Sequence, residues 1–314
     1  MGYRWALIAA SCGACYGPSV TAGAPCGPGE QCPSGLECRD NVCVLPGSQT
    51  SGDAAPPDDA AVDATPLVTD ALPDAPPLGA WGAPVLLATG VSSETDPAMT
   101  LNRLTIVFAS EATDDLYIAT RATPTGTALT STALAVLNTA SDEKAPEISP
   151  DGLTIYFSSN RGGNYDIYRS TFSTVWSPPA LMSELSTAGN ESDFAISHDG
   201  LTAVVIDNDT VNRFLIHTRA STAQPFGNGV HHPELTVGTD PSAPTVTNNG
   251  DVIYFHTGTT RDLYIATRKL DGNYTTAVPV TELNSASRDA APFVLQDDRH
   301  MLFERESDLY ETSR

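Results

Sequence analysis

The stretch EKAPEISPDGLTIYFSSNRGGNYDIYRSTF, residues 143–172, alternates short runs of β-forming residues with turn-forming residues. Pro150, Asp151 and Gly152 favour a tight turn, because proline fixes φ, aspartate can bond its own backbone and glycine tolerates a positive φ. Residues 154–157 are rich in the β-branched and aromatic types that favour strands. The predicted strands, which we name A to D, are residues 146–149, 154–157, 166–168 and 179–182.

Four further segments of the chain align with this one. They are residues 94–121, 191–219, 241–268 and 289–314. An anchor position recurs in them every 48 to 50 residues, at Pro97, Pro146, Phe194, Pro244 and Pro292. A repeat of this length, made only of short strands, is typical of one four-stranded blade of a β-propeller.

The two ends of the repeated region complement each other. Residues 81–87 resemble strand D and follow no strand A, B or C, whereas the final unit ends with strand C at residues 308–312. The N-terminal strand can complete the last blade and cover its open edge. The sequence therefore predicts an all-β propeller of about five blades over residues 81–314. A ring of six blades, one of them divergent, is the alternative, but the residue count leaves no room for it.

The repeat resembles the TolB-like, WD40-like propeller family. The resemblance rests on SPDG at residues 149–152, SHDG at 197–200, YFSSNR at 156–161 and the recurring Asp-Leu-Tyr or Asp-Ile-Tyr. It extends over residues 81–314, although the first and last units replace the turn with TLNR and QDDR. The resemblance implies a propeller that binds partners in the bacterial envelope. It implies no particular partner, because a shared fold is weak evidence for function.

The N-terminus has the outline of an export signal. One positive charge, at Arg4, precedes the apolar residues 5–10 and a run of small residues. This apolar run is too short to span a bilayer as a helix. Residues 1–14 resemble a bacterial lipoprotein signal, in which a cysteine becomes acylated. Cys12 and Cys15 are both candidates: the usual start of such signals favours Cys12, whereas an even count of remaining cysteines favours Cys15.

Residues 15–47 read as a small cysteine-rich module. Cys26, Cys32, Cys38 and Cys43 form a compact, even set, which predicts two disulfides of unknown connectivity in an exported chain. A zinc site is the alternative, but no C-x-x-C pair or nearby histidine supports it. Residues 48–80 consist mostly of Ala, Pro, Asp, Thr and Ser, without any Lys or Arg, and predict an extended, disordered linker.

The net charge of −22 constrains the partner. It argues against nucleic acid and against direct binding to an anionic bilayer, because phosphates would be repelled. Membrane contact is therefore expected only through the N-terminal lipid anchor. The charge favours solubility and cationic partners, and a solvated acidic surface is the simpler interpretation.

One set of acidic residues recurs close to the anchor. In a propeller, strand A lies nearest the central channel, and the D–A and B–C loops share one face. We expect an acidic ring at the channel mouth that binds a cation or a basic peptide. Its members are Glu94, Glu143, Glu191, Asp240 and Asp289. Alternatively, each carboxylate caps a turn or pairs with a neighbouring blade, and this is the interpretation that we favour. No motif predicts a cofactor, and Ca²⁺ has no further support.

No motif predicts a reaction. A G-x-S-x-G elbow is absent, and the acidic residues repeat from blade to blade, whereas an active site usually breaks the symmetry. We therefore predict a non-enzymatic, monomeric binding or scaffold protein of the envelope, which uses the face formed by the D–A and B–C loops to bind a protein or peptide. A polysaccharide-cleaving glycoside hydrolase with channel carboxylates is the alternative. A lectin is the third class, with Tyr165 as the one clear aromatic residue on those loops.

Overall fold

The computed structural model describes residues 37–39, 42–44, 79–208, 212–247 and 250–314. The chain divides into two units, residues 1–71 and 72–314. In the first unit, β1 (Glu37–Arg39) pairs antiparallel with β2 (Val42–Val44), and the backbone register places Cys38 opposite Cys43. The predicted signal, the linker up to residue 78 and the other four cysteines lie outside the described residues. The signal, anchor, disulfides and linker therefore stay predictions.

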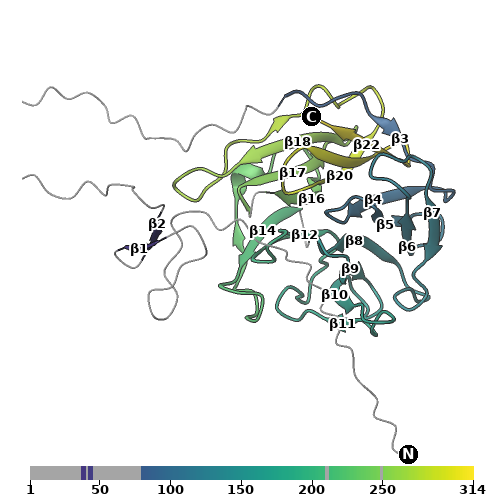
Figure 1. Ribbon diagram of the computed structural model, residues 1–314, viewed down its shortest axis with the longest axis horizontal. Coiled ribbons are helices and arrows are strands. Elements are labelled where there is room, and N and C mark those ends of the chain that lie inside the picture. The colour runs from purple at the N-terminus through teal and green to yellow at the C-terminus, as the bar shows by residue number, and fades with distance from the viewer. Residues whose placement is uncertain (1–36, 40–41, 45–78, 209–211, 248–249) are drawn as a thin grey trace, which may run out of the picture. The chain divides into compact units, whose positions relative to one another are not determined.

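The second unit is a five-bladed propeller, which confirms the predicted fold (Figure 1). Blade 1 contains β4 (Glu94–Met99), β5 (Thr105–Ser110), β6 (Asp115–Thr120) and β7 (Thr130–Ala133). Blade 2 contains β8 (Glu143–Ile148), β9 (Thr154–Ser159), β10 (Asp166–Thr171) and β11 (Ala180–Leu181). Blade 3 contains β12 (Phe194–Ile196), β13 (Thr202–Asp207), β14 (Arg213–Thr218) and β15 (Val230–His231).

Blade 4 contains β16 (Ser242–Thr247), β17 (Val252–Thr257), β18 (Asp262–Thr267) and β19 (Val278–Pro279), and a 3-10 helix, η1 (Pro233–Leu235), precedes it. Blade 5 contains β20 (Asp289–Val294), β21 (His300–Arg305), β22 (Asp308–Ser313) and β3 (Val85–Leu86). All pairs within a blade are antiparallel, and the strands A, labelled β4, β8, β12, β16 and β20, surround the centre of the ring (Figure 1). Among the described residues, no helix is long and apolar enough to cross a membrane.

The predicted closing strand completes the last blade. β3 pairs with β22, with Leu86 opposite Tyr310 and Val85 opposite Glu311. The Leu87 amide donates to the Leu309 carbonyl at 2.9 Å and extends the pairing by one residue. The edge of β22 is thereby covered.

Strand A of blade 2 is longer than the sequence suggested. β8 begins at Glu143, three residues before the predicted start, and its register with β9 shifts between Lys144 and Glu147. The extra residue, Ala145, has a φ of 47°. Asp96, Ala243 and Ala291 hold the same left-handed conformation at equivalent bulges in their blades. A bulge of this kind bends the innermost strand and redirects a side chain.

The core lies between neighbouring sheets. A phenylalanine of strand B stacks on a tyrosine of strand C in four blades, with ring centroids 5.6 to 6.0 Å apart. The pairs are Phe108–Tyr117, Phe157–Tyr168, Phe255–Tyr264 and Phe303–Tyr310. Each pair belongs to a buried cluster that combines residues of neighbouring blades, so the stacked rings help to hold adjacent sheets together.

The A–B turns have the predicted chemistry. Asp151 accepts hydrogen bonds from the Ser149 hydroxyl at 2.6 Å and the Leu153 amide at 2.9 Å, and Gly152 has a φ of 76°. A recurring arginine after strand C donates from Nε to a carbonyl of such a turn. The donor and acceptor pairs are Arg121 to Arg103, Arg219 to Gly200 and Arg314 to Asp298.

Candidate binding site

The central channel widens at both faces and narrows between them. The anchor residues Pro97, Pro146, Phe194, Pro244 and Pro292 line the narrow part, a cavity of about 20 Å³. On the face of the D–A and B–C loops lies a cavity of about 350 Å³, which we call the acidic mouth. On the face of the A–B turns lies a cavity of about 410 Å³, which we call the second mouth.

Carboxylates dominate the acidic mouth. Those that line it are Asp96, Glu111, Asp114, Asp142, Glu143, Asp193 and Asp240. Lys144 and Arg261 are the cationic side chains among the described lining residues. The contributions come from strand A (Asp96 on β4), from B–C loops and from D–A loops, so this is the face that the sequence predicted for binding.

The five predicted carboxylates do not all reach this cavity. Glu143 and Asp240 line it, whereas Glu94, Glu191 and Asp289 do not. All except the exposed Asp240 are buried.

The four buried acids brace the D–A loops. Three of them accept a hydrogen bond from both the main-chain amide and the hydroxyl of the residue four positions earlier. These pairs are Thr139–Glu143, Thr187–Glu191 and Ser285–Asp289. Arginines of strand B or the following loop add ion pairs, Arg161 to Glu143 at 3.0 Å and Arg305 to Asp289 at 2.5 Å.

Glu94 holds the equivalent loop with a different set of donors. It accepts from the Thr89 hydroxyl and from the Leu309 amide of blade 5. Burial raises the pKa of Glu94 to about 7, against the opposing effect of the Leu309 amide. Burial likewise raises the pKa of Glu191. Glu94 thus links blade 1 to blade 5 at the point of closure.

Asp96 and Asp193 are lining carboxylates outside the predicted ring, as are Glu111, Asp114 and Asp142. Asp96 occupies the bulge of β4 and accepts from the Ala145 amide at 3.3 Å, and Asp193 accepts from the Ser242 hydroxyl at 3.0 Å. Burial, together with the charges of Asp193 and Glu304, raises the pKa of Asp96 to about 7, while Lys144 opposes the shift. Neither Asp96 nor Asp193 forms an ion pair with any residue that the structure describes.

A signal for these two residues was present in the repeat. They directly precede the anchors Pro97 and Phe194, where the other three units have alanine, at positions 145, 243 and 291. An acidic residue at a position where the other blades have alanine indicates a local role. An acidic residue that recurs at the same position in every blade is more readily explained by the fold that all blades share.

The cationic side chains near the mouth are partly engaged elsewhere. The Lys144 ammonium lies 4.1 Å from the centroid of the Tyr165 ring, and the Tyr165 hydroxyl donates to Asp142. Arg288, which lies close by, pairs with Glu304 at 3.1 Å and with Glu111 at 3.5 Å. The acidic mouth therefore keeps an excess of negative charge.

Metal ligation has no support in the residues that the structure describes. Within residues 79–208, 212–247 and 250–314, no three His, Cys, Asp or Glu side chains converge closely enough to hold a metal ion. The Asn208 Oδ1 atom, at the edge of the acidic mouth, is buried and has no hydrogen-bond partner among these residues. This amide oxygen can accept a hydrogen bond from a donor that a ligand brings.

Neither a protein-family model nor a curated protein sequence matches the chain. Among solved structures it is similar to TolB from Acinetobacter baumannii, with 18% identity and a TM-score of 0.45 over 71% of this chain. The alignment spans 55% of that protein, a little over half its length. A thermostable family-43 glycoside hydrolase is 11% identical with a TM-score of 0.49, covering 71% of this chain and 89% of that one.

A gluconolactonase from Xanthomonas campestris is similar at 11% identity and a TM-score of 0.47, covering 73% of this chain and 89% of that protein. Likenesses at these levels decide neither the family nor the activity of this chain. The five-bladed architecture rests on its own strands and their pairing.

Proposed function

We propose that this chain is a non-catalytic binding protein of the bacterial envelope, whose acidic mouth receives a cationic segment of a protein partner. The observation that carries the proposal is a cavity lined by seven carboxylates and two cationic side chains, in which Asp96 and Asp193 have no ion pair among the described residues. A lysine or arginine of the partner would supply the missing charge.

The electrostatics of the cavity favour such a ligand. The pKa of Asp96 is raised because its ionised form is desolvated and faces other negative charges. A partner cation placed beside it stabilises the ionised form, so binding releases a proton near neutral pH. The net charge of −22 also attracts a basic partner over long distances and raises the rate of encounter.

The N-terminal segments give the proposal its location. Export by residues 1–14 and acylation of Cys12 or Cys15 would tether the chain to a membrane of the envelope. A linker over residues 48–80 would then hold the propeller, as a monomer, at a distance from that surface. The fold itself assigns no compartment.

The proposal is tested with a pentalysine peptide and a pentaglutamate control, by fluorescence anisotropy at low and moderate salt. We expect pentalysine alone to bind, and the double variant Asp96→Asn/Asp193→Asn to lose at least about tenfold in affinity, or about 1.4 kcal/mol. Asp251→Asn/Asp271→Asn changes the net charge equally at exposed residues remote from the mouth. If both double variants lost the same affinity for pentalysine, the binding would be explained by nonspecific charge attraction, and the assigned site would be refuted.

Glycoside hydrolysis is the alternative function that one observation favours. Asp96 and Glu147 both line the narrow part of the channel, and burial raises the pKa of each. Paired carboxyl groups, one protonated and one ionised, are what this reaction needs. Release of chromophore from a panel of nitrophenyl glycosides, lost in Glu147→Gln, would replace the binding proposal by a catalytic one.

A further inference from the structure

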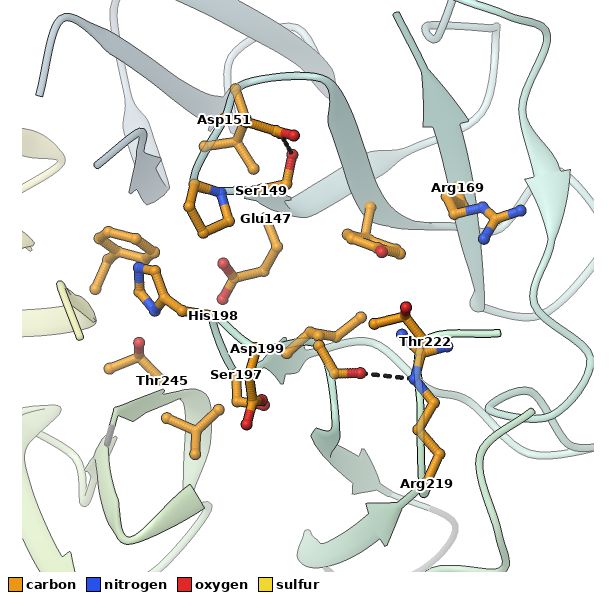
Figure 2. Close-up of a pocket in the computed structure, with 17 residues that line it drawn as sticks. Glu147, Ser149, Asp151, Arg169, Ser197, His198, Asp199, Arg219, Thr222 and Thr245 are labelled. Carbon is orange, nitrogen blue, oxygen red and sulfur yellow. Dashed lines mark hydrogen bonds between the residues drawn. The ribbon is translucent and has the colours of Figure 1, made fainter. Parts of the chain in front are cut away.

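The second mouth is built by the innermost strands of four blades (Figure 2). Its lining residues from these strands are Glu147 and Ile148 of β8, Ile196 of β12, Thr245 and Val246 of β16, and Phe293 of β20. At about 410 Å³ it falls within the range of roughly 300–1,000 Å³ typical of small-molecule sites. The narrow ring of anchor residues separates it from the acidic mouth.

Glu147 provides a polar group at the inner end of this cavity. Figure 2 shows its carboxyl group pointing into the middle of the pocket. It forms no hydrogen bond or ion pair with any residue in the described part of the chain. Burial, and to a lesser degree Asp96, raises the pKa of Glu147 well above its ordinary value. A carboxyl group accepts hydrogen bonds in either protonation state, and its protonated form also donates one.

His198 provides a second polar group with unused capacity. Its Nδ1 atom is buried and has no hydrogen-bond partner in the described part of the chain. Burial lowers the pKa of His198, so the imidazole is neutral at physiological pH. His198 stands where the equivalent turn of blade 2 has Pro150, so the repeat is broken at this point too.

Most of the remaining inner wall is apolar, with Thr245 as a polar member. Ile148, Val246 and Phe293 are buried, and the half-buried Tyr156 also lines the cavity. The Phe293 ring lies 6.3 Å from the His198 ring, centroid to centroid. A ligand in the cavity therefore meets aromatic and aliphatic surface beside the polar side chains of Glu147, His198 and Thr245.

Charged groups of both signs are mixed around the rim. Asp151 and Asp199 hold the A–B turns of blades 2 and 3. Arg169 forms no ion pair with a described residue, and the Arg219 guanidinium donates, among the described residues, to the carbonyls of Gly200 and Gln224. A small ligand with a net charge of either sign would meet a like charge at the rim. The guanidinium groups of Arg169 and Arg219 can still donate hydrogen bonds to the oxygen atoms of a neutral ligand.

We propose that the second mouth binds a neutral carbohydrate of one or two sugar units. A sugar ring presents apolar C–H faces to aromatic and aliphatic walls, and its hydroxyl groups both donate and accept hydrogen bonds. The Glu147 carboxyl group and the neutral imidazole of His198, which both line the cavity, can form hydrogen bonds with those hydroxyl groups. The site is separate in space from the acidic mouth, because the narrow ring of anchor residues lies between the two cavities.

The test uses the full chain and isothermal titration calorimetry with glucose, galactose, N-acetylglucosamine, maltose, lactose and cellobiose. Glucuronate and glucosamine serve as charged counterparts. We expect at least one neutral sugar to bind with a Kd below about 1 mM. His198→Pro installs the turn residue of blade 2, so it should keep the fold while lowering the affinity at least about tenfold. Glu147→Ala should do the same, whereas the uncharged isostere Glu147→Gln should stay within about threefold.

Several outcomes would overturn the assignment. These are no heat from any neutral sugar at 10-fold the expected Kd, binding of the charged sugars alone, or affinity unchanged in both His198→Pro and Glu147→Ala. Each variant is first checked for an unaltered urea-unfolding midpoint, so that loss of fold is not mistaken for loss of binding. Pentalysine should not displace the sugar, which keeps this test separate from that of the acidic mouth.

Discussion

Asp96 couples the charge of the acidic mouth to the stability of the fold. Its pKa is about 7 in the folded protein against an ordinary value of 3.8, because burial and the charges of Asp193 and Glu304 disfavour the ionised form. Between these values the folded chain retains a proton that the unfolded chain has released. The contribution of Asp96 to stability is therefore largest below about pH 4 and is lost as the pH rises towards 7.

The substitution Asp96→Asn removes this titration. Relative to the unsubstituted protein, the variant should gain more than about 1 kcal/mol of unfolding free energy between pH 5 and pH 8. Urea unfolding at several pH values measures the difference. Asp114→Asn, at an exposed residue of the same cavity, should leave the profile unchanged. Parallel profiles for the Asp96 variant and the parent would contradict the assigned ionisation.

Four of the five D–A loops depend on one buried acid each, and blade 2 shows the fullest arrangement. Glu143 is fully buried and accepts from the Thr139 amide and hydroxyl, from the Ser159 hydroxyl at 2.7 Å and from Arg161. Removing it leaves these donors and the guanidinium group without their acceptor.

We expect Glu143→Ala to cost about 3–5 kcal/mol of unfolding free energy, the range for a buried ion pair that loses one partner. The matched control is Asp240→Asn, at the exposed member of the predicted ring, which should change stability by less than about 0.5 kcal/mol. Urea midpoints measure both. A cost for Glu143→Ala no larger than that of the control would show that the loop holds without its acid.

Closure of the ring is the feature on which the whole molecule depends. Trp81 is buried beside Tyr254 of blade 4, with ring centroids 6.4 Å apart, and the Arg314 guanidinium lies 4.2 Å from its ring centroid. Gly82 exchanges hydrogen bonds with Ser313 and Thr312 at 2.9 and 2.7 Å. Residues from both ends of the propeller therefore meet in one blade.

Trp81→Ala should lower the free energy of unfolding by about 3–5 kcal/mol, because a large buried ring is replaced by a cavity. Val85→Ala, in the same closing segment but half exposed, should cost under about 1 kcal/mol. Calorimetry and urea unfolding measure the change. A separate early transition in the tryptophan variant would show that blade 5 unfolds by itself, contrary to a cooperative closed ring.

The repeated residues of the sequence were sufficient to predict the blades. Strands B and C are rich in β-branched and aromatic residues, and the Ser-Pro-Asp-Gly turn of blade 2 carries its own hydrogen bonds, so these elements depend on local chemistry. The closing strand followed from the uneven ends of the repeat. The strands and turns are determined by residues close together in the sequence, and the closing strand follows from a count of the predicted strands.

The first half of strand A and the channel could not be predicted in the same way. The bulge at Asp96 depends on the register between β4 and β5, and the raised pKa of its carboxyl depends on Asp193 and Glu304 of other blades. The predicted ring residue Glu191 is turned into its own loop instead, as is Asp289. The sequence alone determined which residues repeat. The tertiary structure alone decided which acids face the channel, because burial and mutual repulsion arise only when five blades meet around one axis.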